Sequence, residues 1–170
     1  MSDAVLFDAR ADGVAVITLN RPETRNALGA EVRDGLRAAW DRFECDASLR
    51  VAILTGAGDN AFCAGGDLKA MVADGMQVPP RDFFPVPGDS IEISKPTIAA
   101  VNGVAFAGGW MIAQACDLCV ASTTAKFAIT EVKVGRSSPW AAPLIHMIPQ
   151  RIMMEIILTG KPITAQRAYE

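Results

Sequence analysis

Hydrophobic residues gather in short runs along the first part of this chain, and polar or glycine-bearing segments separate the runs. The first two runs predict strands over Val5–Arg10 and Val14–Leu19. Ala11-Asp12-Gly13 between them has the composition of a tight turn. We therefore expect the two strands to pair as a hairpin.

A helical period follows the hairpin. Val32, Leu36, Trp40 and Phe43 recur at steps of four, four and three, with charged residues between them. This spacing places the four side chains on one face, which is typical of an amphipathic helix packed on a core. Gly29 is the expected N-cap residue.

Later runs predict the rest of the framework. We expect strands at Val51–Thr55, Thr97–Val101, Leu118–Ala121 and Lys126–Thr130, and helices from Asp67, over Trp110–Cys116, over Arg151–Leu158 up to Gly160, and after an N-cap at Thr164. Gly56–Gly66 is expected to be a loop. Val78–Gly88 carries four prolines and two phenylalanines, which indicates an irregular segment that is either a connector or an aromatic flap over an apolar ligand.

Composition narrows the classes of protein. The 170 residues suffice for one domain, and 51% hydrophobic residues exclude wholesale disorder. A net charge of −3 argues against a broad nucleic-acid surface. Pro96–Cys116 is uncharged, but its glycines, Asn102 and Gln114 favour strand, turn and helix in a core over a membrane span.

The four cysteines do not form a disulfide scaffold, and no secretory signal is visible, so we expect reduced thiols and a cytoplasmic protein. Cys116 and Cys119 form a CxxC pair. A metal site would need further ligands beside this pair, and the sequence shows no pattern for them, since the only histidine, His146, is distant in sequence. We expect no metal site.

Two glycine turns carry the candidate chemistry. Gly65-Gly66 and Gly108-Gly109 each precede a predicted helix and follow apolar sequence. The first N–H groups of a helix have no partner within it, and glycine allows a ligand to approach the backbone closely. If the two turns converge, two amides can hold one oxyanion.

Several motifs together resemble the crotonase family, also called enoyl-CoA hydratase/isomerase. The motifs are Asn20-Arg21-Pro22-Glu23, Asn26-Ala27-Leu28, Phe62-Cys63-Ala64-Gly65-Gly66-Asp67-Leu68-Lys69, Ala100-Val101-Asn102-Gly103, Ala107-Gly108-Gly109 and Asp117. The resemblance implies an α/β fold, a crotonase-like spiral of repeated β-β-α turns over residues 1–163. It also implies that residues 164–170 begin a C-terminal helical region that is truncated here.

The resemblance also implies roles for individual residues. The N–H groups of Gly66 and Gly108 are expected to stabilise a thioester enolate, and Glu131 is expected to act as acid and base. The residues expected to contact the acyl-CoA substrate are Arg25, Ala27, Ala64, Asp67, Leu68, Lys69 and Met111. Arg25 and Lys69 also suit the phosphates of CoA, although both residue types are common on solvated surfaces. Coenzyme A enters as part of the substrate, and we expect no separate cofactor. The family further implies a homo-oligomer, either a trimer or a dimer of trimers.

The sequence departs from the family pattern at two places. Met111 stands where hydratases carry a second acid, which leaves Glu131 alone and suits double-bond migration. Arg136-Ser137-Ser138-Pro139-Trp140 replaces a glycine-rich helix start, so serine hydroxyls are candidates to replace amide donors. Trp140 is expected either to line the acyl pocket or to fill the core, with the core favoured.

Three functions remain open at this stage. The first is an enoyl-CoA hydratase or isomerase, which Gly66, Gly108 and Glu131 favour. The second is an acyl-CoA hydrolase on the same scaffold, and the third is a non-catalytic acyl-CoA-binding module. Met111 keeps both of the latter open.

Overall fold

A computed structural model describes residues 3–73, 75 and 79–170, and strands from this part of the chain form two sheets. The order in one sheet is β1-β2-β3-β5-β7, and the order in the other is β4-β6-β8-β9. The strands are β1 Val5–Ala9, β2 Val14–Leu19, β3 Val51–Gly56, β4 Ala61–Cys63, β5 Thr97–Val101, β6 Val104–Phe106, β7 Leu118–Ala121, β8 Lys126–Ala128 and β9 Ile163–Thr164.

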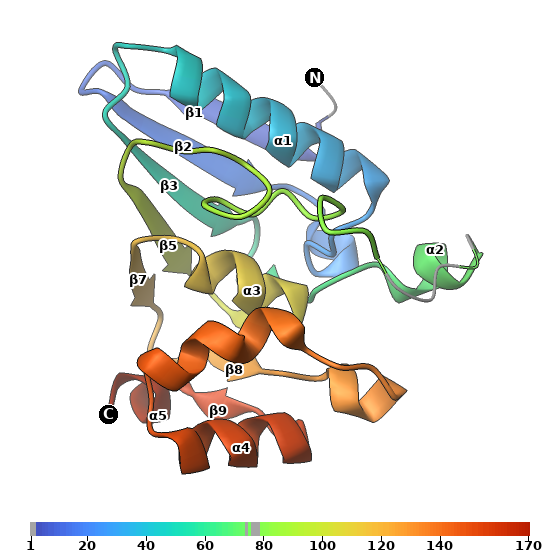
Figure 1. The fold of residues 1–170 in the computed structure, drawn as a ribbon. Coiled ribbons are helices and arrows are strands. Elements are labelled where there is room, and N and C mark those ends of the chain that lie inside the picture. Colours follow the sequence, from blue (N-terminus) through green and yellow to red (C-terminus); the bar gives the residue numbers. More distant parts are fainter. Residues whose placement is uncertain (1–2, 74, 76–78) are drawn as a thin grey trace.

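Helices cover the sheets and lie at both ends of the molecule (Figure 1). The α-helices are α1 Ala30–Cys45, α2 Leu68–Ala73, α3 Gly108–Gln114, α4 Gln150–Thr159 and α5 Ala165–Tyr169, and the 3-10 helices are η1 Pro22–Thr24, η2 Glu131–Val134 and η3 Pro139–His146. Helix α1 packs on β1 and β2. Helices α4 and α5 lie at the opposite end of the molecule from α1.

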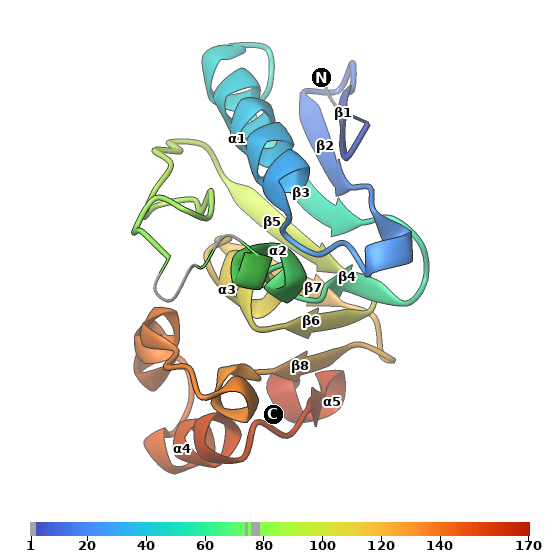
Figure 2. The same cartoon turned by 90° about the vertical axis from the view of Figure 1, so that its right-hand side faces the viewer.

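A repeated unit of two strands and a helix builds this arrangement. Along the chain, β3 and β4 lead to α2, β5 and β6 lead to α3, and β7 and β8 lead to η2. Each repeat adds one parallel strand to each sheet, and Figure 2 shows β6 and β8 side by side next to α3. The predicted α/β spiral of β-β-α turns is therefore confirmed.

Helix α1 has the predicted apolar face. Val32, Leu36, Trp40 and Phe43 are buried, and Gly29 is the N-cap with extended backbone angles. The N-terminal hairpin is also confirmed, because β1 and β2 pair antiparallel.

The other predicted elements match the structure with small differences. Strands β3, β5 and β7 and helices α4 and α5 lie where the sequence places them, Gly160 ends α4 with a φ of 59°, and Thr164 caps α5. No helix or strand falls within residues 79–88, as expected for a proline-rich segment, whereas Val78 lies outside the described residues. Strand β9 lies across the expected boundary between the spiral core, residues 1–163, and the C-terminal helical region, residues 164–170. This boundary stays a prediction.

Three predictions require correction. The expected loop Gly56–Gly66 contains β4, because a strand of three fully buried residues shows no alternation in its sequence. Helix α3 begins at Gly108 and ends at Gln114, rather than covering Trp110–Cys116, because both glycines are part of its first turn. Strand β8 ends at Ala128 instead of Thr130.

The uncharged stretch 96–116 folds as β5, β6 and α3. Within the described residues, no helix is both long enough and apolar enough to cross a membrane.

Candidate active site

The three residues expected to carry the chemistry follow three neighbouring parallel strands. Gly66 lies three residues after β4, Gly108 two residues after β6, and Glu131 three residues after β8. These strands are adjacent in the order β4-β6-β8 and run parallel. All three positions therefore lie beyond the same edge of one sheet, where α/β proteins bind their ligands.

The backbones of the two glycine turns are in close contact. A Cβ atom added to Gly108 would lie 3.6 Å from the backbone nitrogen of Gly66, and one added to Gly65 would lie 3.3 Å from the nitrogen of Gly108. Within the described part of the chain, neither the Gly66 nor the Gly108 amide donates a hydrogen bond. The two N–H groups are thus near each other, and neither has an acceptor among the described residues.

The conformation of the turns explains why glycine occurs there. Gly65 has a φ of +98°, which side chains disfavour. A Cβ on Gly109 would lie 2.1 Å from the carbonyl oxygen of Cys63, so only glycine lets α3 approach the end of β4. Ala107, the N-cap of α3, also has a positive φ of 50°. Such strain in a non-glycine residue is frequent at functional sites.

Glu131 begins η2 and its side chain is half-buried. Burial raises the pKa of this carboxyl above its ordinary value, and the indole N–H of Trp140 and the side chain of Ser138 partly oppose the effect. Among the described residues, Oε2 is buried and receives no hydrogen bond. A carboxyl with a raised pKa and one unbonded oxygen suits proton transfer.

Trp140 contacts Glu131 directly, which the sequence did not reveal. Its indole nitrogen donates a hydrogen bond of 2.7 Å to Glu131 Oε1. The favoured interpretation of Trp140 as a core residue is incomplete, because the half-buried ring packs against the core and also bonds the acid. Gln114, at the end of α3, donates 3.2 Å from Nε2 to the carbonyl oxygen of Trp140. No motif in the sequence pointed to Gln114.

Apolar side chains lie near the glycine turns. Met111, one turn into α3, is half-buried and packs against the core. A Cβ on Gly66 would lie 3.1 Å from the sulfur of Met71 and 3.4 Å from Cζ of Phe84. The ring of Phe84 thus reaches Gly66, as the flap interpretation of the proline-rich segment requires.

Cation–π and hydrogen-bond contacts hold that segment against α1. The guanidinium of Arg33 lies 3.8 Å from the centre of the Phe83 ring, and Phe83 packs edge to face on Phe84. Arg37 donates 2.7 Å to the carbonyl oxygen of Asp82. Cation–π and hydrogen-bond contacts of this kind fix the position of Phe84 relative to the helix.

Four of the residues expected to contact CoA are adjacent in space. The amide of Ala64 donates 3.0 Å to the carbonyl oxygen of Arg25, and Leu28 forms a parallel bridge with Gly66. Ala27 and Asp67 line one pocket. The loop after η1 and the turn after β4 therefore form one surface beside the glycine turns.

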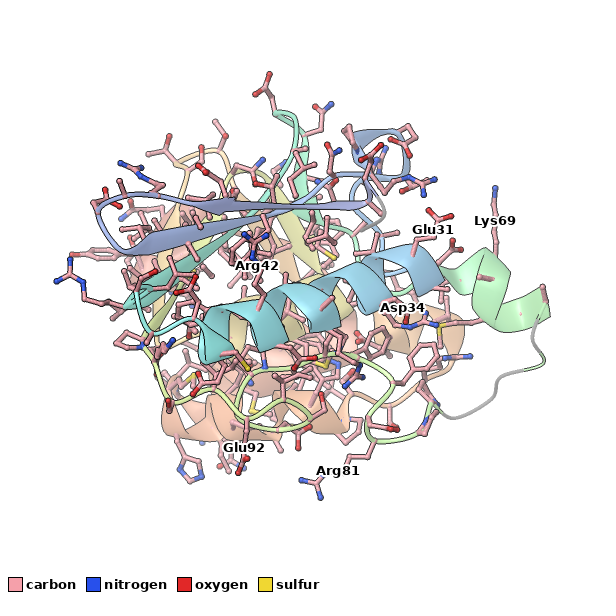
Figure 3. All side chains as sticks on the ribbon, turned by 90° about the horizontal axis from the view of Figure 1, so that it is seen from above. Glu31, Asp34, Arg42, Lys69, Arg81 and Glu92 are labelled. Carbon is pink, nitrogen blue, oxygen red and sulfur yellow. The ribbon has the colours of Figure 1, made fainter. Side chains whose placement is uncertain are left out.

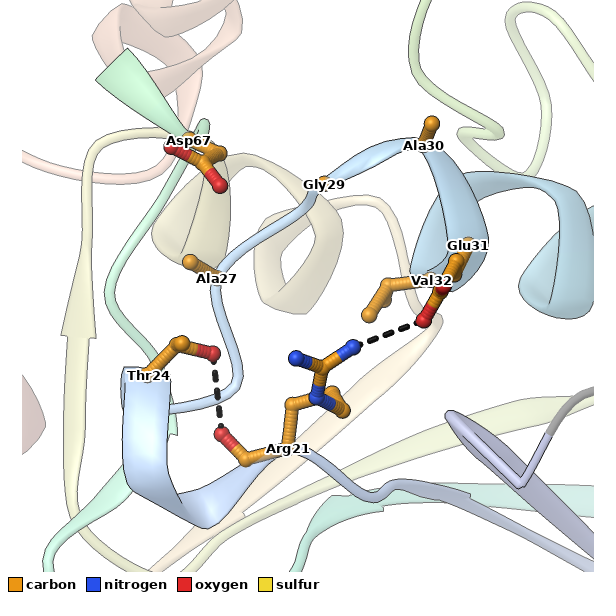
Figure 4. A pocket seen from close by; sticks show the side chains of 8 residues that line it. All are labelled: Arg21, Thr24, Ala27, Gly29, Ala30, Glu31, Val32 and Asp67. Carbon is orange, nitrogen blue, oxygen red and sulfur yellow. Dashed lines mark hydrogen bonds and ion pairs between the residues drawn. The ribbon is translucent and has the colours of Figure 1, made fainter. Parts of the chain in front are cut away.

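The pocket is shown in Figure 4. It lies between the η1 loop, the start of α1 and Asp67. The guanidinium of Arg21, which lines the pocket, forms salt bridges with Glu31 at 2.7 Å and with Glu23. Its full lining is Arg21, Thr24, Ala27, Gly29, Ala30, Glu31, Val32 and Asp67. Two carboxylates and one guanidinium line it, so its own charge is negative.

Lys69 and Leu68 lie on the first turn of α2, and both are exposed. Figure 3 shows Lys69 pointing away from the body of the molecule. Asp67 holds the start of this helix, because its Oδ1 accepts hydrogen bonds of 3.1 Å from the amides of Lys69 and Ala70. Arg25 is exposed as well.

The CxxC pair lies away from these turns. Cys116 and Cys119 are free, and burial raises the pKa of the Cys116 thiol to about 12. In the described residues, no group of three His, Cys, Asp or Glu side chains is arranged to bind a metal ion.

Comparison with known proteins identifies the family. The sequence profile of the enoyl-CoA hydratase/isomerase family matches residues 9–170. The chain belongs to this family. It is 42% identical over 91% of its length to the (E)-benzylidenesuccinyl-CoA hydratase of Thauera aromatica and, at the same identity and coverage, to the enoyl-CoA hydratase EchA19 of Mycobacterium tuberculosis. It spans 62% and 61% of those two proteins.

Solved structures of the enoyl-CoA hydratase/isomerase family share the fold. An enoyl-CoA hydratase from Mycobacterium tuberculosis superimposes with a TM-score of 0.86 at 43% identity, over 98% of this chain and 65% of that protein. The enoyl-CoA hydratase EchA1 from Mycobacterium marinum gives a TM-score of 0.85 at 43% identity, with the same coverage.

Proposed function

We propose that this enoyl-CoA hydratase/isomerase family member catalyses the reversible addition of water to a 2-enoyl-CoA thioester. The observation that carries the proposal is the placement of Gly66, Gly108 and Glu131 beyond the ends of three adjacent parallel strands. Relatives named as hydratases and as a carnitinyl-CoA dehydratase support water chemistry.

The mechanism begins with polarisation of the thioester. The amides of Gly66 and Gly108 donate to the thioester oxygen and stabilise the negative charge that forms there. Because amides hold this charge, the mechanism calls on no metal or redox cofactor.

Glu131 moves the protons in both steps. As a carboxylate it takes a proton from water while the water oxygen bonds to the β-carbon, and the electrons of the double bond move onto the thioester oxygen. The protonated acid then returns the proton to the α-carbon as the enolate collapses. The raised pKa of Glu131 makes both protonation states accessible. Met111 offers no acid, so Glu131 performs both steps alone.

Coenzyme A is proposed to lie along the surface formed by the loop after η1 and the start of α2. Arg25 and Lys69 supply exposed positive charge for its phosphates, and Ala27, Ala64, Asp67 and Leu68 lie beside them. This charge counters the negative lining of the pocket in Figure 4.

The test compares wild type with Glu131→Gln on crotonyl-CoA, by loss of the conjugated double bond. Glutamine keeps the size of the side chain and cannot transfer the proton, so kcat should fall about 10²–10⁴-fold with little change in KM. Equal rates for the two proteins would remove Glu131 from the mechanism, and no turnover by wild type would overturn the proposal.

Double-bond migration is the second candidate, and Met111 favours it. Isomerisation needs one base to take a proton from the carbon next to the thioester carbonyl and return it two carbons farther on. Conversion of a 3-enoyl-CoA to the conjugated 2-enoyl-CoA that is faster than hydration of crotonyl-CoA would favour this candidate.

A further inference from the structure

The contact between Trp140 and Glu131 joins two segments that the sequence separates by nine residues. Glu131 begins η2, and Trp140 is the second residue of η3. Pro139 fixes the backbone of the first turn of η3. The Nε1–Oε1 distance of 2.7 Å is that of a strong hydrogen bond to an ionised acceptor.

The hydrogen bond has a directional consequence for the carboxyl group. An indole N–H donates and never accepts, whatever the pH. When Glu131 is protonated, a proton on Oε1 would face this N–H, and two donors would oppose each other. The proton therefore resides on Oε2, the buried oxygen that receives no hydrogen bond from the described residues.

A second hydrogen bond connects this pair to the helix of the oxyanion donor. Gln114 is the last residue of α3, which begins at Gly108. Its Nε2 donates to the carbonyl oxygen of Trp140, while its Oε1 is buried without a partner in the described chain. A buried amide oxygen without a hydrogen bond destabilises the folded protein. We infer that Gln114 occurs here because its Nε2 positions Trp140.

We propose that Trp140 is a positioning residue for the function proposed above: its indole N–H holds Glu131 so that Oε2 alone carries the transferred proton, and Gln114 fixes Trp140 relative to the helix that begins at Gly108. A side chain that only filled the core would need the ring and not its N–H group.

The Trp140→Phe variant separates these roles, because phenylalanine keeps an aromatic ring and loses the donor. With crotonyl-CoA, kcat should fall about tenfold or more while KM changes less than about threefold. The loss of a donor that stabilises the carboxylate raises the pKa of Glu131, so the acidic limb of the kcat profile should move to higher pH.

Two further variants complete the set. Trp40→Phe is the matched control, because the Trp40 indole nitrogen is buried in α1 and has no hydrogen-bond partner among the described residues. This control should leave both kcat and the pH profile unchanged. Gln114→Met leaves Trp140 in place and removes its anchor, so it should change kcat in the same direction by a smaller factor.

A Trp140→Phe protein that folds and keeps the wild-type kcat and pH profile would overturn the positioning role. If Trp140→Phe does not fold, a Gln114→Met protein with wild-type kcat and pH profile would overturn it. NMR titration of the ¹³C-labelled Glu131 carboxyl separates a failure of the positioning role from a failure of the proposed function. The signal that is missing in Glu131→Gln identifies the Glu131 carboxyl. If wild type turned over no thioester, a higher Glu131 pKa in Trp140→Phe would still support the positioning role, and an unchanged pKa would overturn it.

Discussion

At the scale of single residues, the environment of Glu131 links stability to pH. Burial raises the pKa of this half-buried carboxyl above its ordinary value of 4.5, so the folded protein binds the proton more tightly than the unfolded chain. Its contribution to stability is complete below the ordinary pKa and is lost as the pH rises through the raised value. The carboxylate at neutral pH is therefore a local source of instability.

Glu131→Gln should remove this pH dependence, since glutamine does not ionise. From about pH 4 to about pH 8, the Tm of the variant relative to wild type should increase, because wild type loses stability as Glu131 ionises. Thermal unfolding followed by circular dichroism measures the difference. A Tm difference that stays constant with pH would show that ionisation of Glu131 does not affect folding.

The sequence predicted some of these residues and missed others for a physical reason. Gly66 and Gly108 belong to motifs and Glu131 follows a predicted strand, and the structure places all three beyond one sheet edge. Gln114 and the bond from Trp140 escaped prediction, because such contacts depend on how α3 and η3 pack and leave no pattern in the sequence.

At the scale of elements, helix α1 shows how much a period predicts and where it stops. The four apolar residues of its buried face follow from their spacing, and Gly29 follows from its place before the helix. The spacing of apolar residues does not predict whether a side chain caps the N-terminus of the helix. In the structure the N-cap residue, Gly29, supplies no side-chain hydrogen bond to α1.

Gly29→Ser should therefore stabilise the protein relative to Gly29→Ala by about 1 kcal/mol. Both variants reduce the freedom of the unfolded chain to a similar extent, so their difference isolates the capping hydrogen bond. Gly29 has a φ of −68°, and a Cβ there would meet only Asp67 at 3.7 Å or more, so both side chains fit. Urea unfolding measures the gap, and equal stabilities would mean that serine does not cap α1.

The short strands mark the limit of prediction at this scale. Strands β4 and β6 have three residues each, too few for a period to emerge. Both follow a longer strand of the first sheet within a few residues, so their conformation is set by the parallel pairing of neighbours. The sequence predicted the longer strand of each repeat and also β8, but it missed β4 and β6.

At the scale of the whole molecule, strand β3 lies at the centre of the first sheet. Strand β3 pairs with β2 on one side and β5 on the other, and Ala52 and Leu54 are fully buried. The segment 79–88 contains no regular element and is fixed mainly by contacts of its side chains and backbone with α1.

Amide hydrogen exchange should reflect this difference. The amides of Ala52 and Leu54 should exchange only through global unfolding, whereas exposed amides such as that of Asp82 should exchange at least about 100-fold faster. Exchange followed by NMR at one pH compares them directly. Comparable rates at these positions would mean that the molecule has no cooperative core around β3.

The order β4-β6-β8 also fixes the spacing between the residues that follow these strands. Neighbouring strands of a sheet are about 4.8 Å apart, and this pitch belongs to the backbone. In the proposed mechanism the two amide donors follow β4 and β6 and the acid follows β8, so the spacing of these strands sets the distance between the donors and the acid. Under the proposed mechanism, main-chain geometry therefore determines which carbon the acid reaches, and we expect side-chain changes in the loops to alter the acyl group accepted without changing the position of reaction.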